Sequence, residues 1–217
     1  MKGAESMLFG DWSFAGAADA AKAAVRDPSN FHWSFIALFA LVVMIYVDAI
    51  RKREWKAVAA ALMLYSVHWL YEIANAVICH LTGYALWTVS PESTSFILLI
   101  GVSWELSMMF AVAGFLSRLL PADRGLKICG VNNRVLFAVG TALFFSVVEI
   151  FLAWTPAFLW VYPWWGALPV FVTTYIPFFL ASFLIYDREP KAQRSWIGGL
   201  AALNVALLCV LVPLGVI

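Results

Sequence analysis

Hydrophobic residues run along this chain in six long stretches, separated by short polar segments. The stretches cover residues 33–50, 57–79, 94–119, 134–161, 167–186 and 196–216. Each approaches or exceeds the roughly 20 residues that an α-helix needs to cross the hydrocarbon core of a bilayer. The pattern therefore predicts an all-α fold: a polytopic membrane protein with six transmembrane helices in one bundle.

The segment before the first stretch differs in character. Residues 1–32 are predicted to form an N-terminal non-cytoplasmic segment, and residues 33–217 the six-helix transmembrane domain. Within the first segment, the sequence AGAADAAKAAVRD is a candidate short interfacial helix that ends before Pro28. It either covers the outer surface of the bundle or frays, and fraying is the simpler expectation.

The distribution of basic residues orients the helices. The loops after the first, third and fifth stretches carry Arg51, Lys52, Arg53, Lys56, Arg118, Arg124, Lys127, Arg134, Arg188, Lys191 and Arg194. The remaining basic residues, Lys2, Lys22 and Arg26, precede the first stretch. Because Lys- and Arg-rich loops stay in the cytoplasm, both termini are predicted to be non-cytoplasmic. The expected location is the cytoplasmic membrane of a bacterium or an equivalent membrane.

Composition supports the membrane class. The chain has 64% hydrophobic and 12% charged residues, whereas soluble domains carry about 25% charged residues. The net charge of +1 gives no reason to expect nucleic acid as a partner. Three scattered cysteines, with no CxxC spacing, indicate neither a disulfide framework nor a zinc site. The expected partners are the lipid bilayer and a membrane lipid or hydrophobic small molecule, and the oligomeric state is left open.

Four ionisable residues interrupt the apolar stretches: His68, Glu72, Glu105 and Glu149. All 14 lysines and arginines lie at or beyond the ends of the stretches. Ionisable groups at membrane depth are costly, usually face the interior of the bundle, and mark a functional site. Acids without a nearby base require either that some carboxyl groups keep their protons or that a cation binds among them.

The helical register gathers these residues. Tyr65, His68, Glu72, Asn75 and Cys79 follow one another at spacings of three and four, so they share one stripe of the second helix. His68 and Glu72 are one turn apart and can share a proton or a ligand. At about 1.5 Å per residue, the other two glutamates lie at a similar depth. The sequence therefore predicts a pocket between the second, third and fourth helices that faces the outer side.

Further residues at this depth are predicted to line the pocket and bind a substrate. They are Tyr65, Trp69, Asn75, Trp104, Trp154, Thr173, Tyr175 and Asn204. For each one alone, ordinary packing or hydrogen bonding between helices is the simpler interpretation. Trp87 and the Trp160–Trp165 stretch lie in outer loops, where tryptophan is typical of an aromatic belt at the headgroups.

Three interpretations of the four principal residues remain. A protonated glutamate could hold helices together, or one histidine and three carboxylates could bind a metal. The metal interpretation is weakened because only His68 is available as a deep nitrogen ligand and no ExxH pair occurs. Neither a metal nor a cofactor is therefore predicted. The favoured interpretation is an acid–base site in an apolar pocket, with catalytic roles for His68, Glu72, Glu105 and Glu149.

The His68-x3-Glu72 spacing, with Glu105 on the next helix, resembles the sterol-isomerase and emopamil-binding family. The resemblance covers the second to fifth helices and implies that these residues protonate a sterol double bond and remove a neighbouring proton. It also implies that Tyr65, Trp69, Trp104 and Trp154 stabilise the intermediate carbocation. The chain departs from that family in its sixth helix and in Ile73, which replaces a glycine. The pair Trp104-Glu105 also resembles integral-membrane terpene cyclases.

The sequence thus favours an enzyme, a membrane-embedded isomerase or cyclase that acts on an isoprenoid- or sterol-like lipid by protonation. A proton- or cation-coupled small transporter is the main alternative, because carriers also gather carboxylates near the midplane. A lipid-binding or metal-binding subunit without turnover is a further alternative.

Overall fold

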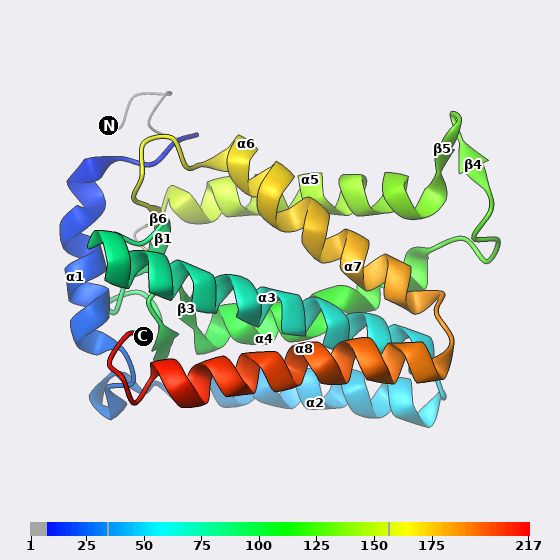
Figure 1. The fold of residues 1–217 in the computed structure, drawn as a ribbon, viewed down its shortest axis with the longest axis horizontal. Helices are drawn as coiled ribbons and strands as arrows, with labels where there is room; N and C mark the ends of the chain where they lie inside the picture. Colours follow the sequence, from blue (N-terminus) through cyan, green and yellow to red (C-terminus); the bar gives the residue numbers. More distant parts are fainter. Residues whose placement is uncertain (1–7, 34, 156) are drawn as a thin grey trace.

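The computed structural model describes residues 8–33, 35–155 and 157–217, so Lys2 lies outside the described residues. The protein is mostly helical. The long helical segments run side by side along the long axis of the molecule (Figure 1); they are α2 (Phe35–Arg51), α3 (Trp55–Thr82), α4 (Trp104–Ala113), α5 (Asn133–Ala153), α7 (Ile176–Tyr186) and α8 (Pro190–Leu211).

Four helical segments of the described chain are long and apolar enough to cross a membrane. They are α3, α5, α8 and the continuous helical stretch Ala167–Tyr186, which contains α6 (Ala167–Val170), a π-helical turn (Phe171–Tyr175) and α7. α2 has 17 residues, and α4 has 10 residues before a 3₁₀ helix, Gly114–Leu119, continues it. Membrane helices are thus supported, whereas the count of six spans stays a prediction.

The third and fourth apolar stretches are only partly helical. Residues 94–119 were expected to form one helix, but α4 begins at Trp104, because the preceding segment forms the antiparallel strands β2 (Ile97–Leu99) and β3 (Val102–Ser103). α5 ends at Ala153 and is followed by β6 (Phe158–Trp160). Apolarity alone cannot separate a buried strand from the end of a buried helix. The predicted boundaries are therefore wrong at these points.

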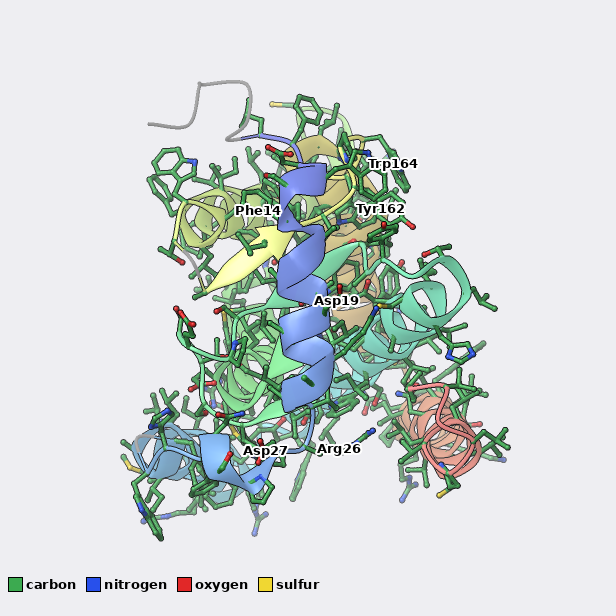
Figure 2. All side chains as sticks on the ribbon, turned by 90° about the vertical axis from the view of Figure 1, so that its left-hand side faces the viewer. Phe14, Asp19, Arg26, Asp27, Tyr162 and Trp164 are labelled. Atoms are coloured by element: carbon green, nitrogen blue, oxygen red, sulfur yellow. The ribbon has the colours of Figure 1, made fainter. Side chains whose placement is uncertain are left out.

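One end of the bundle is covered by α1 (Ala15–Ala24) and by a ribbon of β1 (Trp87–Val89) paired antiparallel with β6. Figure 2, which looks onto this end, shows α1 crossing in front of the other helices. Ala18 and Ala21 of α1 are fully buried. The candidate interfacial helix therefore packs onto the bundle and does not fray.

The N-terminal segment before α1 is tied to the same end. Ala167 N donates to Leu8 O (2.9 Å), and Gly10 N donates to Trp165 O (2.7 Å). The C-terminal residue also lies here, because Arg26 Nη2 donates to Ile217 O (2.9 Å). The two ends of the described chain thus lie at one end of the bundle (Figure 1).

α3 is the central helix, packed against α4, α7 and α8. Its first half carries small residues on the buried face, among them Ala60 and Ala61. A Cβ at Gly114 would come within 2.6 Å of Ala60 O, so the chain after α4 approaches the α3 backbone too closely for any larger residue. Close backbone approach through small residues is typical of helix packing in membranes.

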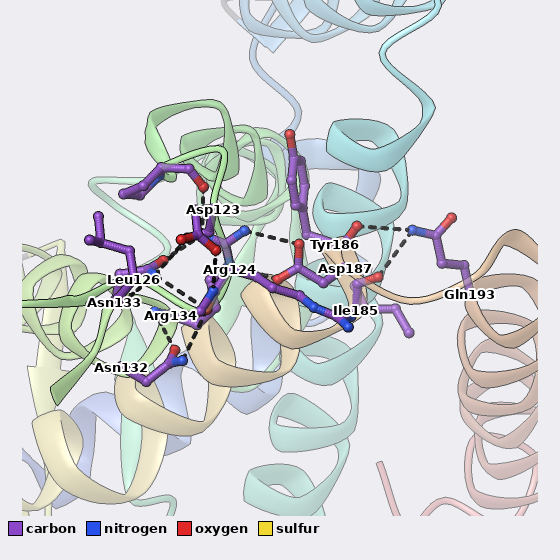
Figure 3. A network of polar contacts seen from close by, with 12 residues as sticks. Asp123, Arg124, Leu126, Asn132, Asn133, Arg134, Ile185, Tyr186, Asp187 and Gln193 are labelled. Carbon is purple, nitrogen blue, oxygen red and sulfur yellow. Dashed lines mark hydrogen bonds and ion pairs between the residues drawn. The ribbon is translucent and has the colours of Figure 1, made fainter.

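The opposite end carries the basic loops and is fastened by a polar network (Figure 3). Arg134 Nε and Nη2 donate to the two carboxylate oxygens of Asp187, at 2.6 and 2.9 Å. Arg134 Nη1 donates to Pro121 O (2.8 Å). This bidentate pair joins the start of α5 to the end of α7, beside the hairpin of β4 (Lys127–Ile128) and β5 (Val131–Asn132).

Candidate functional site

A small cavity of about 30 Å³ lies inside the bundle, beneath the β1–β6 ribbon. α3, α4, α5 and the helical stretch 167–186 contribute its walls. Its polar lining comes from His68, Glu72, Trp87, Glu149, Thr174 and Tyr175, and its apolar lining includes Phe110 and Phe178. No lysine or arginine is among the described residues that line it. The cavity therefore combines two carboxyl groups with aromatic walls and no basic counter-charge.

Glu72 is held on the α3 side of the cavity. It is 5% exposed, and Trp87 Nε1 donates to both of its carboxylate oxygens, at 3.3 and 3.2 Å. His68 Nδ1 lies 3.7 Å from Glu72 Oε1, a distance longer than a hydrogen bond. The i, i+4 spacing on one helix face produces this arrangement.

Glu149 faces the same cavity from α5. Its Oε1 accepts a hydrogen bond from Trp160 Nε1 (2.7 Å), and its Oε2 accepts one from the Tyr175 hydroxyl. The side chain is 6% exposed. Glu72 and Glu149 line the same cavity, from α3 and α5. The two acids thus form one site, although 77 positions separate them in the sequence.

The β1–β6 ribbon holds both acids. Trp87 and Trp160 are directly opposite each other in the antiparallel register, so their side chains project from the same face of the ribbon. Each indole N–H reaches a different glutamate. Both rings are buried, at 7% and 2% exposure. The expectation that these two tryptophans belong to a headgroup belt is therefore wrong, whereas Trp164, at 59% exposure, fits it.

His68 supplies the third ionisable group. Its ring is 1% exposed and stacks on Phe110, with the ring centroids 4.1 Å apart. Its Nε2 has no hydrogen-bond partner among the described residues, and the same holds for Thr174 Oγ1. Buried polar atoms of this kind are rare in proteins and often have a functional reason. The cavity thus contains an imidazole nitrogen that is available to interact with a bound molecule.

Asn75 and Gly101 fix the position of Trp87. Asn75 Nδ2 donates to Trp87 O (2.9 Å), and Asn75 Oδ1 accepts from Leu86 N (2.8 Å), so α3 holds the start of β1. A Cβ at Gly101 would come within 2.6 Å of Glu72 Oε2. The tight turn between β2 and β3 can therefore lie against the acid only because residue 101 is a glycine.

The π-helical turn presents Thr174 and Tyr175 to the cavity. Pro177 follows this turn and cannot donate a hydrogen bond to the carbonyl four residues earlier, that of Thr173. The Tyr71 hydroxyl on α3 donates to that carbonyl instead (2.8 Å). A π-turn next to a proline is thus stabilised by a neighbouring helix, and such turns are frequent at functional sites.

The structure brings together three of the four predicted principal residues. Glu105 does not line the cavity; it is partly buried and accepts a hydrogen bond from Ser95 N (2.8 Å). It lies in the first turn of α4, where a carboxylate also favours the helix dipole. The expectation of one pocket shared by all four residues is therefore corrected to a cavity shared by His68, Glu72 and Glu149.

The predicted substrate-binding residues lie in different places. Of the eight, only Tyr175 lines the cavity. Tyr65 bonds to Ser107 Oγ (2.9 Å), Trp104 stacks on Phe35, and Trp154 is half exposed beside Phe151. The others, with roles in packing or hydrogen bonding to the backbone, are Trp69, Asn75, Thr173 and Asn204.

The sequence does not reveal the indole donors or the aromatic walls of the cavity. Tryptophan in a loop between apolar stretches looks the same whether it faces headgroups or a buried acid, so the sequence carries no signal that separates the two. Phe110 and Phe178 lie in apolar helices, where the local sequence does not show which rings face a cavity. Among the residues that the structure describes, no group of three or more His, Cys, Asp or Glu side chains could hold a metal ion.

Comparison with known proteins gives a family match. The family described as "Uncharacterized membrane protein family" matches residues 15–213. A protein of Archaeoglobus fulgidus, described as "Uncharacterized protein", is 38% identical over 199 residues, which cover 89% of this chain and 94% of the relative. No solved structure matches. Neither match supports the resemblance to sterol isomerases or terpene cyclases.

Proposed function

Because the chain belongs to this family of membrane proteins, we propose that it works within the bilayer as an acid–base enzyme on an apolar lipid. The proposal includes six membrane crossings, with α2 and the α4 segment as the two shorter ones, and both termini on the non-cytoplasmic side. The basic loops at the end opposite α1 support that orientation. The substrate class is an isoprenoid- or sterol-like lipid with a carbon–carbon double bond.

One observation carries the proposal: two carboxyl groups and a free imidazole nitrogen converge on a cavity with aromatic walls. Burial without a lysine or arginine partner favours the neutral, protonated form of a carboxyl group. A protonated acid in an apolar site is a proton donor for a substrate that offers no lone pair. The rings of Phe110 and Phe178 face the same space, where they would stabilise a developing cation.

The proposed reaction is an isomerisation in three proton movements. The Glu72 carboxyl group gives its proton to one alkene carbon, and the π electron pair forms the new C–H bond. His68 Nε2 then takes a proton from the carbon next to the cation, and that C–H electron pair forms the new double bond. The Nδ1 proton of the imidazolium returns to Glu72, 3.7 Å away, and proton exchange with water then restores the Nδ1–H tautomer of His68 before the next turnover. Glu149 is held by Trp160 and Tyr175. Repulsion between two nearby carboxylates means that Glu149 favours the protonated form of Glu72.

The test is deuterium exchange in deuterated water. The purified protein in lipid nanodiscs is incubated with a panel of unsaturated isoprenoid and sterol lipids, and mass spectrometry follows carbon-bound deuterium. We expect incorporation with the wild type and a loss of about 100-fold or more with Glu72→Gln or His68→Gln. Glu105→Gln is the matched control, because Glu105 lies outside the cavity. Equal exchange in the wild type and Glu72→Gln would overturn the proposal.

A second candidate function is a proton- or cation-coupled carrier. The observation that favours it is the size of the cavity, about 30 Å³, which suits a water molecule or a small ion. Pockets for drug-sized ligands measure about 300–1,000 Å³, and a lipid needs at least as much space. Proton or sodium flux into protein-containing liposomes that Glu149→Gln abolishes, with no deuterium exchange into any lipid, would favour the carrier.

A further inference from the structure

The seam between the α4 segment and α5, the line along which these two segments face each other, has a hollow of different character near each end. The first is the acid cavity, to which α4 contributes Leu106 and Met109 and α5 contributes Leu152. These three side chains are only partly buried. The second is an apolar groove of about 470 Å³, lined by Leu116 and Leu119 of the 3₁₀ helix and by Leu136, Phe137, Gly140, Thr141 and Phe144 of α5. Both hollows are thus built on the same two consecutive segments.

The α5 side of the seam is continuous. Residues 137, 141, 144, 148 and 152 follow one another at spacings of three and four, so they lie on one face of the helix. From Leu136 in the groove to Leu152 at the cavity, α5 rises about 24 Å. Phe144 on this face is 63% exposed. An extended hydrocarbon chain lying on this face would therefore reach from the groove to the two acids.

We propose that this seam binds the tail of a membrane-dissolved linear isoprenoid, with its reacting double bond at the acid cavity. This inference rests on the proposed function and names its substrate class more narrowly: a flexible chain and not a rigid ring system. The cavity is too small for a whole lipid, whereas the groove lies within the usual range of ligand pockets. The substrate enters sideways from the bilayer, past Leu106 and Met109, because α1 and the β1–β6 ribbon cover the end of the bundle.

A second apolar groove provides an internal comparison. It has a similar volume, about 480 Å³, and lies between α3 and α8, where its lining includes Leu62, Ile197 and Gly198. None of its described lining residues also lines the acid cavity. A bilayer lipid that merely coats the protein would occupy both grooves alike, but a substrate tail would prefer the groove on the α4–α5 seam.

Two glycines allow a matched experiment. Gly140 lies in the seam groove and Gly198 in the α3–α8 groove, and a Cβ at either position would meet no heavy atom within 4 Å. Leucine at either site therefore fills a groove without disturbing the protein interior. The probe is geranylgeraniol bearing a diazirine near its tail, photo-crosslinked to the protein in nanodiscs and mapped by mass spectrometry.

We expect crosslinks within residues 136–144, reduced at least about tenfold by Gly140→Leu and unchanged in Gly198→Leu. Crosslinks spread equally over both grooves, or unaffected by Gly140→Leu, would overturn the inference. Glu72→Gln separates it from the proposed function, because removing the acid should stop deuterium exchange while tail labelling persists. If Gly140→Leu leaves deuterium exchange into a linear substrate unchanged, the seam does not bind the substrate tail. The proposed acid–base function would be unaffected by that result.

Discussion

Trp87 and Trp160 are cross-strand partners whose indole N–H groups each hold a different buried glutamate. The pairing couples α3, which carries Glu72, to α5, which carries Glu149, through a ribbon of only three residues per strand. The ribbon is therefore more than a cover for the bundle end. It sets the distance between the two acids, and a change in either indole should alter the position of the glutamate that it holds.

Replacement of Trp87 by phenylalanine tests this coupling. Trp87→Phe keeps a buried ring but removes the N–H that donates to Glu72. Because a buried acceptor then loses its donor, we expect the free energy of unfolding to fall by about 1–3 kcal/mol. Chemical unfolding in detergent micelles measures the change. Trp164→Phe is the control, since that ring is exposed; equal effects of the two substitutions would refute a specific role for the indole.

Alanine at Gly101 should lower the free energy of unfolding, whereas alanine at an ordinary helical glycine should raise it. A Cβ at this position would come within 2.6 Å of Glu72 Oε2 and 2.5 Å of Asn75 Nδ2. Gly101→Ala should therefore displace the acid and lower the free energy of unfolding by about 1–3 kcal/mol. Gly16→Ala in α1, where a Cβ meets nothing within 4 Å, should raise stability by about 0.5–1 kcal/mol. Unfolding curves that shift in the same direction would contradict the close packing at Gly101.

The ion pair between Arg134 and Asp187, at the end of the bundle opposite α1, should affect stability but not chemistry. The Arg134 side chain is 4% exposed and that of Asp187 is 19% exposed. Arg134→Met leaves the partly exposed Asp187 carboxylate without its bidentate partner, so we expect a loss of about 1–3 kcal/mol in the free energy of unfolding. Deuterium exchange by the fraction that remains folded should be unchanged. Lys191→Met, at an exposed position, is the control; comparable losses in both variants would show that the buried pair contributes little.

Helical periodicity could predict which face of α3 is buried, because a stripe of polar residues at spacings of three and four has one physical interpretation. His68, Glu72 and Asn75 are all buried, as that stripe requires. Depth alone could not predict the cavity. The rise per residue predicts a similar depth for Glu105 and Glu149, but the first turn of α4 presents Glu105 to Ser95. Its orientation depends on where the helix begins, and the apolar run 94–119 conceals that point.

The other features that the sequence could not predict depend on contacts between segments that are far apart in the chain. Trp87 and Trp160 are 73 positions apart, and a register between two three-residue strands has no signature in local composition. The π-turn at Phe171–Tyr175 depends in the same way on a partner far along the chain, the Tyr71 hydroxyl. Local sequence thus specified the helices and the identity of the acids, while the contacts that aim those acids arise only when distant segments meet.

The orientation in the membrane can be tested with native and introduced cysteines. Cys129 is exposed between β4 and β5 at the basic end, and Ala20 is exposed on α1 at the opposite end. In a Cys209→Ser background, a membrane-impermeant maleimide should label Ala20→Cys in intact spheroplasts, because α1 is expected outside. Cys129 should become labelled only after the membrane is permeabilised. Labelling of Cys129 in intact spheroplasts would invert the proposed topology, and labelling of both sites there would contradict the proposed set of membrane crossings.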